Sequence, residues 1–178
     1  MKRTAACTTV ALCLFLAGCE TPTSQRYAVS ADNNIALRNL GVVGVAVGSF
    51  VGPANFNASC RLVGPLQVAD GLTHTQYIQR AIDSELKLSG VAAVSGSPRI
   101  VLTGNVTRLE FSSVTGVGSR DFWAIDLTLR SSNGKTLNVQ ARHEFNSGFL
   151  GTEACRQTAD AFPRAVQDLI ANALRHPQ

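Results

Sequence analysis

One antiparallel hairpin constrains the fold of this chain more than any other feature. Apolar and polar residues alternate over residues 123–130 and again over residues 137–145, which is typical of two strands that each bury one face. Asn133-Gly134 stands between these runs, and this dipeptide favours the tight turns that join neighbouring antiparallel strands. The two runs therefore predict a β-hairpin whose apolar side packs against a second layer.

Two further strands are predicted before the hairpin. Residues 42–50 are rich in valine and glycine without helical spacing, and residues 100–111 combine β-branched and apolar side chains. The glycines of residues 115–119 favour a connection between strands. The alternative is a phosphate-binding loop, but such a loop would open a helix, whereas this segment precedes a strand. Residues 100–145 therefore predict a three-stranded antiparallel meander.

Two amphipathic helices are also predicted. Thr73 and Gln76 have the spacing of a capping box, and Gly90 stands where the helix would end. The helix between them has one apolar stripe, formed by Ile78, Ala81, Ile82 and Leu86. A second stripe lies near the carboxyl end, formed by Phe162, Val166, Leu169, Ile170, Ala173 and Leu174. Because proline fits poorly inside a helix, Pro163 predicts either a helix that begins near Phe162 or a kink there.

The order of these elements predicts the fold class. A strand, a helix, three antiparallel strands and a helix form an α+β domain, in which an antiparallel sheet carries two amphipathic helices on one face. This two-layer sandwich would bury the stripes of both helices. Residues 34–178 are enough for a single globular domain of this kind. Cys155 would lie on the turn before the last helix.

The amino terminus has the parts of a secretory signal. Lys2 and Arg3 precede an apolar run of about a dozen residues, which is shorter than the ~20 needed to span a bilayer. The run ends in the sequence LAGC at residues 16–19, which resembles the bacterial lipobox. The resemblance implies removal of residues 1–18, acylation of Cys19, and sorting to the outer membrane because Glu20 is not the aspartate that retains lipoproteins. A chance cysteine in an apolar run is the alternative.

The segment after this cysteine and the overall charge limit the expected partners. Residues 19–33 are polar and short of large aliphatic side chains, so we expect a flexible tether. Removing residues 1–18 deletes Lys2 and Arg3 and no acidic residue, so the formal net charge falls from +4 to about +2. The remaining lysines and arginines are scattered, whereas a nucleic-acid partner would require a clustered basic face. We therefore expect no nucleic-acid partner.

The remaining cysteines predict one disulfide. Cys7 and Cys13 leave with the signal and Cys19 is acylated, so Cys60 and Cys155 form the pair left in an oxidising compartment. A bond between them would close a loop of about 95 residues, which stabilises a fold by roughly 4 kcal/mol if chain entropy dominates. Two buried free thiols are the alternative. A redox-active pair is disfavoured because the sequence has no C-x-x-C motif.

The histidines are the candidates for acid–base chemistry. His143 falls on the apolar face of its strand, where it is either a hydrogen-bonded core or edge histidine, which we favour, or a buried general base paired with a carboxylate. Neighbouring Glu144 points to the other face of the strand and cannot be that partner directly. His74 is expected to be exposed beside its helix cap, and His176 lies near the carboxyl terminus.

Other motifs for chemistry are missing from the sequence. It contains no H-E-x-x-H, no paired cysteines at metal-ligand spacing and no G-x-S-x-G. We therefore predict a protein that is not an enzyme and that has no cofactor and no metal site. Phe122 and Trp123 could face a partner, but we favour core packing for Trp123. For residues 145–155 we favour a crossover between strand and helix over an exposed apolar lip.

Two blocks carry a resemblance to known proteins. They are YIQRAIDSEL at residues 77–86 and ACRQTADAFPRAVQDLI at residues 154–170. With the lipobox and the hairpin, they make the chain resemble a family of small, largely uncharacterised Gram-negative envelope lipoproteins. Its order of elements resembles, more distantly, the TolB amino-terminal module, the curli lipoprotein and the penicillin-binding-protein activator lipoproteins. Those proteins bind other envelope proteins, which implies an interaction role here, although the pore-forming segments of the curli lipoprotein have no counterpart.

The sequence thus predicts a lipid-anchored, non-enzymatic protein on the periplasmic side of the outer membrane. Its predicted role is that of a protein-interaction or envelope-assembly module, with the membrane and another envelope protein as partners. The alternative is a carrier or binder of a lipid or small hydrophobic ligand, which would require an apolar cleft. A flat apolar patch would favour the interaction module instead. A hydrolase would require a carboxylate within hydrogen-bonding reach of an accessible His143.

Overall fold

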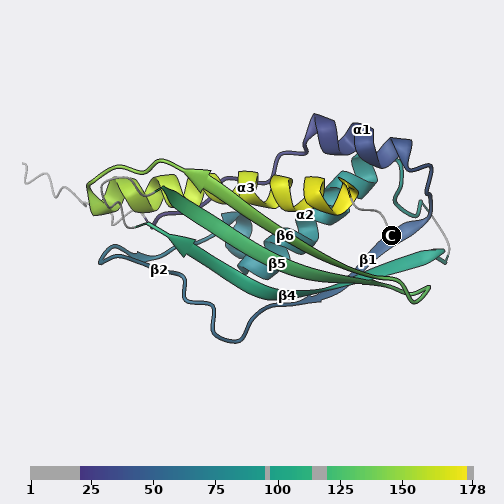
Figure 1. Cartoon of the computed structure of the whole chain (residues 1–178), viewed down its shortest axis with the longest axis horizontal. Helices are drawn as coiled ribbons and strands as arrows, with labels where there is room; N and C mark the ends of the chain where they lie inside the picture. Colours follow the sequence, from purple (N-terminus) through teal and green to yellow (C-terminus); the bar gives the residue numbers. More distant parts are fainter. Residues whose placement is uncertain (1–20, 95–96, 114–119, 176–178) are drawn as a thin grey trace, which may run out of the picture.

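A mixed four-stranded sheet and three helices make up an α+β fold. The computed structural model describes residues 21–94, 97–113 and 120–175. Neighbouring strands of the sheet are, in order, β1 (Val45–Val51), β4 (Ile100–Ser112), β5 (Asp121–Ser131) and β6 (Thr136–Phe145). On one face of this sheet lie α2 (His74–Leu88) and α3 (Gly151–Arg175), and α1 (Ala31–Asn39) packs on those two helices (Figure 1).

Strand β1 differs from the prediction of a wholly antiparallel sheet. It runs parallel to β4, with Val45 opposite Ile100 and Ala46 opposite Val101. The antiparallel prediction is therefore wrong at this pair, whereas β4, β5 and β6 form the predicted antiparallel meander. The reason lies in the long connection, because a crossover that contains a helix returns the chain in the same direction. That crossover contains α2 and three short elements: β2 (Ser59–Cys60), β3 (Gly64–Pro65) and the 3-10 turn η1 (Ala69–Gly71).

Two locally encoded elements form as predicted. The β5–β6 hairpin turns at Asn133-Gly134, where the Gly134 amide donates to the Ser131 carbonyl over 2.9 Å. Helix α2 begins with the predicted capping box, in which Thr73 and Gln76 each accept a hydrogen bond from the backbone amide of the other. Gly90 follows this helix with a φ of 76°, a conformation that favours glycine.

Helix α3 is longer than predicted. It runs without a break from Gly151 through Pro163 to Arg175, so the prediction of a helix that begins near Phe162 is wrong. Pro163 cannot donate to the carbonyl four residues earlier, but buried side chains lie on both sides of it, including Cys155, Ala159, Val166 and Leu169. Packing along both halves of the helix therefore outweighs the missing hydrogen bond.

The chain after Thr21 lies against the domain, where a flexible tether over residues 19–33 was expected. The Gln67 amide donates to the Pro22 carbonyl and the Ser24 amide donates to the Gln67 carbonyl, both over 2.9 Å. Farther on, the Tyr27 hydroxyl and the Ser30 amide donate to one oxygen of buried Glu85, over 2.6 and 2.9 Å. We call residues 21–30 the strap. The buried carboxylate of α2 gains hydrogen bonds from it, which offsets the cost of burial.

The predicted disulfide is present in the structure. The sulfur atoms of Cys60 and Cys155 are 2.08 Å apart, and both residues are fully buried. Cys155 lies in the first turns of α3, not on a turn before the helix as expected, because α3 begins at Gly151. The bond joins the short β2–β3 pair to the start of α3. Cys19 and the signal of residues 1–18 lie outside the described residues.

Candidate functional site

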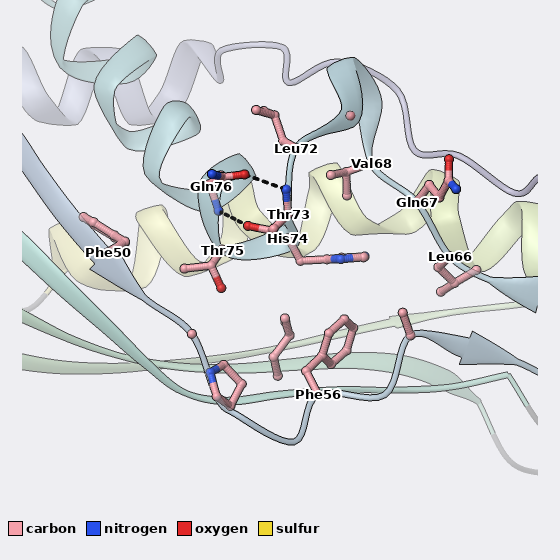
Figure 2. Close-up of a pocket in the computed structure, with 15 residues that line it drawn as sticks. Phe50, Phe56, Leu66, Gln67, Val68, Leu72, Thr73, His74, Thr75 and Gln76 are labelled. Carbon is pink, nitrogen blue, oxygen red and sulfur yellow. Dashed lines mark hydrogen bonds between the residues drawn. The ribbon is translucent and has the colours of Figure 1, made fainter.

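An open cleft of about 700 Å³ lies between the start of α2 and the loop that follows β1. Figure 2 shows its two sides: residues 66–76 on one, and Phe50 with the loop that carries Phe56 on the other. Three separate stretches of the chain, residues 50–58, residues 66–76 and Leu109 of β4, meet in this cleft. We call it the α2 cleft.

Apolar side chains form most of the α2 cleft wall. They are Phe50, Phe56, Leu66, Val68, Leu72 and Leu109. Two glycines permit the close approaches that shape it. A Cβ at Gly104 would lie 2.3 Å from the Phe50 ring, and a Cβ at Gly52 would lie 2.2 Å from the Thr75 hydroxyl. The ring of Phe50 therefore rests directly on the backbone of β4.

The polar part of the α2 cleft is the amino terminus of α2. The capping box orders this turn, so that Thr73, His74, Thr75 and Gln76 all line the cleft. The Gln76 amide donates to Thr73 in the capping box, whereas the His74 and Thr75 amides before it have no partner within the helix, and amides at a helix start carry a partial positive charge. This end of the cleft thus favours a hydrogen-bond acceptor or an anionic group.

His74 provides the most unusual side chain of the cleft. It is only 9% exposed and its imidazole points into the cleft (Figure 2). Three aromatic rings surround it, with centroid distances of 4.8 Å to Phe56, 5.0 Å to Phe162 and 5.8 Å to Trp123. Among the described residues, none forms a hydrogen bond with the imidazole. The ring is therefore a buried polar group that faces the cleft.

Burial also fixes the charge state of His74. Desolvation lowers the pKa of this imidazole from 6.5 to about 4. Near neutral pH the ring is uncharged, so one ring nitrogen is able to donate a hydrogen bond and the other is able to accept one. A ligand in the cleft can thus satisfy a group that the described residues leave without a hydrogen bond.

The expectation that His74 is exposed is wrong. The capping box correctly places it at the start of α2, but the helix start is covered by the loop that carries Phe56. A signal was present in the sequence, because His74, Ile78 and Ile82 are spaced four residues apart and share one helix face. Extending the apolar stripe back by one turn would have placed the histidine on the buried side.

His143 lies on the face of β6 that packs against α3. Its Nδ1 is 2.8 Å from the Asp168 carboxylate, with side chains 25% and 52% exposed. This is the carboxylate neighbour that a catalytic histidine would require, supplied by α3 rather than by Glu144. Neither residue lines the α2 cleft. The contact also matches the favoured interpretation of His143 as a hydrogen-bonded edge histidine that joins β6 to α3.

The aromatic pair at the start of β5 is not presented to solvent. Trp123 is fully buried, and its indole N–H donates to the Thr158 carbonyl over 2.8 Å. Phe122 is partly buried beneath the Arg142 guanidinium, which lies 3.5 Å from the ring centroid. The prediction of core packing for Trp123 is thus confirmed. The glycine segment of residues 115–119 lies outside the described residues.

An exposed apolar cluster lies beside the disulfide. Phe149 is 88% exposed, Leu150 is 66% exposed and Leu62 is fully exposed. Arg61 joins the two segments, because its guanidinium donates to the Phe149 carbonyl over 2.9 Å. We call Leu62, Phe149 and Leu150 the apolar tip. Residues 146–150 join β6 to α3, so the predicted crossover is present, and it also exposes Phe149 and Leu150 as an apolar lip.

Within residues 21–94, 97–113 and 120–175, no group of three His, Cys, Asp or Glu side chains is placed to hold a metal ion. Over the same ranges, no helix combines the length and the apolar character that crossing a bilayer requires.

Three solved structures resemble this fold at low sequence identity. An uncharacterized protein is 14% identical over 88% of this chain and 98% of its own, with a TM-score of 0.50. A Xanthomonas campestris protein of the family designated DUF330 is 15% identical over 87% and 92%, with a TM-score of 0.49. A PelC dodecamer from Paraburkholderia phytofirmans is 15% identical over 84% and 93%, with a TM-score of 0.36.

The comparisons bear on the fold and not on an activity. No protein-family model matches this chain, and no curated protein sequence matches it. At 14% identity, the similarity with a TM-score of 0.50 shows a shared fold alone.

Proposed function

We propose that this protein is a lipid-anchored, non-enzymatic binding protein on the periplasmic side of the outer membrane. Its α2 cleft takes a small molecule with an apolar chain and a hydrogen-bonding head. The cleft is the observation that carries the proposal, because its volume falls within the range of about 300–1,000 Å³ typical of ligand pockets. The cleft therefore favours a binder of a small hydrophobic ligand over a protein-interaction module.

The lining of the α2 cleft supports an amphipathic ligand. Phe50, Phe56 and Leu109 offer an apolar surface to a chain. At the other side, neutral His74 and the first amides of α2 favour an acceptor or anionic head group. A purely apolar ligand would leave the buried imidazole without a hydrogen bond, which costs about 1–3 kcal/mol. A medium-length fatty acid has both required parts.

Titration of the unacylated mature chain with dodecanoate tests this proposal. The change in intrinsic fluorescence or a calorimetric signal gives the affinity. Ala58→Trp fills the cleft from its lining and should weaken binding at least about tenfold. Val43→Trp adds the same bulk at an exposed position outside the cleft and should bind like the wild type. Undetectable binding to the wild type would reject the proposal. An Ala58→Trp variant that binds as tightly as the wild type would reject it as well.

The His74→Phe variant distinguishes binding of the ligand's head group from binding of its apolar chain. This variant keeps the ring volume but removes both ring nitrogens. It should weaken dodecanoate binding by roughly five- to tenfold, the value of one hydrogen bond, while dodecane-like probes without a head group lose nothing. Equal losses for both probes would show that His74 shapes the cleft without contacting the head.

The protein-interaction module remains the second candidate, favoured by a separate observation. Leu40, Val42, Val43 and Leu88 are exposed aliphatic residues. Arg38 joins their segments, because its guanidinium donates to the Leu88 carbonyl over 3.3 Å. This patch suits another envelope protein, in keeping with the predicted resemblance to the TolB module and the penicillin-binding-protein activators. Crosslinking in intact cells should lose its protein adducts with Val43→Asp if the patch binds a partner.

The lipid anchor has its own test. Acylation of Cys19 predicts that the wild-type protein sediments with the outer membrane and that Cys19→Ala releases it to the soluble periplasm. Mass spectrometry of the amino-terminal peptide should show the acyl groups. A soluble wild type, or a membrane-bound Cys19→Ala variant, would refute the anchor without bearing on the α2 cleft.

A further inference from the structure

The apolar tip is held in a fixed shape although its side chains face solvent. Cys60 immediately precedes Arg61 and Leu62, and its disulfide ties this turn to α3. The Arg61 guanidinium donates to the Ser113 carbonyl over 2.7 Å and to the Phe149 carbonyl over 2.9 Å. Leu150 is fixed as well, because its carbonyl accepts from the Ala154 amide at the start of α3.

This arrangement costs free energy in water, since two large aliphatic side chains and a phenyl ring remain exposed together. Such a rigid apolar cluster indicates that another apolar surface covers it. The position of the strap indicates which surface that is.

The strap enters the domain next to the apolar tip. Its Thr23 forms a parallel bridge with Gln67, two residues after β3, and β3 pairs with β2. Because this pairing is parallel, Thr21 lies on the side of the bridge toward the β2–β3 turn that carries Leu62. Figure 1 shows β2 and the start of α3 at the same end of the molecule.

The distance from this point to the expected anchor is short. Cys19 is two residues before Thr21, so the chain between them spans at most ~7 Å. A bilayer that holds acyl chains on Cys19 would therefore lie beside the end of the domain that carries Leu62, Phe149 and Leu150.

We propose that the apolar tip inserts into the phospholipid surface to which Cys19 is anchored. The domain then stands on the bilayer at this end. The exposed patch of Leu40, Val42, Val43 and Leu88 lies at the other end of the sheet, where β1 begins and α2 ends, and faces the periplasm. This inference rests on the proposed lipid anchor and adds an orientation that the anchor alone does not give.

Tryptophan reporters test the orientation in the acylated full-length protein. Phe149→Trp places an indole in the apolar tip, and Val43→Trp places a matched indole at the opposite end of the sheet. Both variants retain Trp123, which is fully buried and gives the same background. In vesicles of phosphatidylethanolamine and phosphatidylglycerol, lipids brominated on the acyl chain should quench the Phe149→Trp emission. The Val43→Trp emission should not change.

A second measurement uses the unacylated chain, so that acyl groups do not contribute to vesicle binding. The unacylated chain should bind the same vesicles weakly, and replacing Leu62, Phe149 and Leu150 with serine should lower its partition coefficient at least about tenfold. The three side chains are exposed, so circular dichroism should show an unchanged fold. A matched triple variant at Val42, Val43 and Leu88 should partition like the wild type.

The outcomes separate the two proposals. An acylated protein whose Phe149→Trp emission is not quenched would overturn the membrane-facing tip and leave the anchor standing. A wild type without acyl groups would overturn the anchor, and unchanged partition of the serine variant would then overturn the tip as well. Shielding of the Phe149→Trp indole that depends on protein concentration, without bromine quenching, would assign the tip to a second copy of the chain.

Discussion

The buried imidazole of His74 makes the stability of this protein depend on pH in a way that can be calculated. The perturbation is His74→Gln, which replaces the titrating ring with an uncharged amide. The ordinary pKa of a histidine is 6.5, and burial lowers the pKa of His74 to about 4 in the folded protein. Between these values the unfolded chain binds a proton at this residue and the folded chain does not.

The direction and size of the effect follow from this difference. The free energy of unfolding rises with pH wherever the unfolded state binds more protons, so acid destabilises the folded protein. The histidine has no effect above about pH 7, where it is neutral in both states. From about pH 7.5 to about pH 5 it lowers the free energy of unfolding by about 2 kcal/mol, and the loss reaches about 3 kcal/mol near pH 4.

Urea denaturation at several pH values, with the disulfide intact, measures this loss. The wild type and His74→Gln share every other titrating group, so the difference between their free energies of unfolding isolates His74. That difference should change by about 2 kcal/mol between about pH 7.5 and about pH 5, with the variant gaining relative stability in acid. Parallel pH profiles for the two proteins would refute the reasoning, because they would show that the imidazole is not desolvated.

Three further predictions concern contacts that hold the fold. Replacing Cys60 and Cys155 with serine should lower the free energy of unfolding by about 4–5 kcal/mol in denaturant titrations, because the bond spans 95 residues; a loss below about 1 kcal/mol would contradict the chain-entropy explanation. Tyr27→Phe removes a hydrogen bond to the buried Glu85 carboxylate and should cost about 1–3 kcal/mol, and no loss would mean that the strap contributes nothing. Gly104→Ala should cost about 1–3 kcal/mol and weaken dodecanoate binding, because its Cβ would collide with Phe50; unchanged binding would place Phe50 outside the ligand site.

The elements that the sequence predicts correctly are those with local causes. The hairpin at Asn133-Gly134 depends on alternation and turn chemistry, and the start of α2 depends on Thr73 and Gln76, three residues apart. The disulfide was predicted because only two cysteines remain once those of the predicted signal and lipobox are set aside. Each of these features depends on neighbours in sequence or on a count of residues.

The features that the sequence did not predict depend on distant contacts. Whether β1 runs parallel to β4 is decided by the crossover, and the continuity of α3 through Pro163 is decided by packing on the sheet. The α2 cleft joins stretches around Phe50, residues 66–76 and Leu109, which share no periodicity. His74 was placed correctly on its helix, but its burial by Phe56 follows from a loop whose path no local pattern encodes.

The resistance of the strap to an applied force depends on the direction of that force. Force applied at Thr21 along the strap loads its contacts together: the two backbone hydrogen bonds at Gln67, and the Tyr27 and Ser30 contacts with Glu85. Force applied at Thr21 at right angles to the strap, away from the surface of the domain, instead breaks these contacts one after another, beginning at Gln67. A pull along the strap is therefore resisted more strongly than a pull that peels it off the domain, and peeling lengthens the connection while the sheet and the disulfide stay intact.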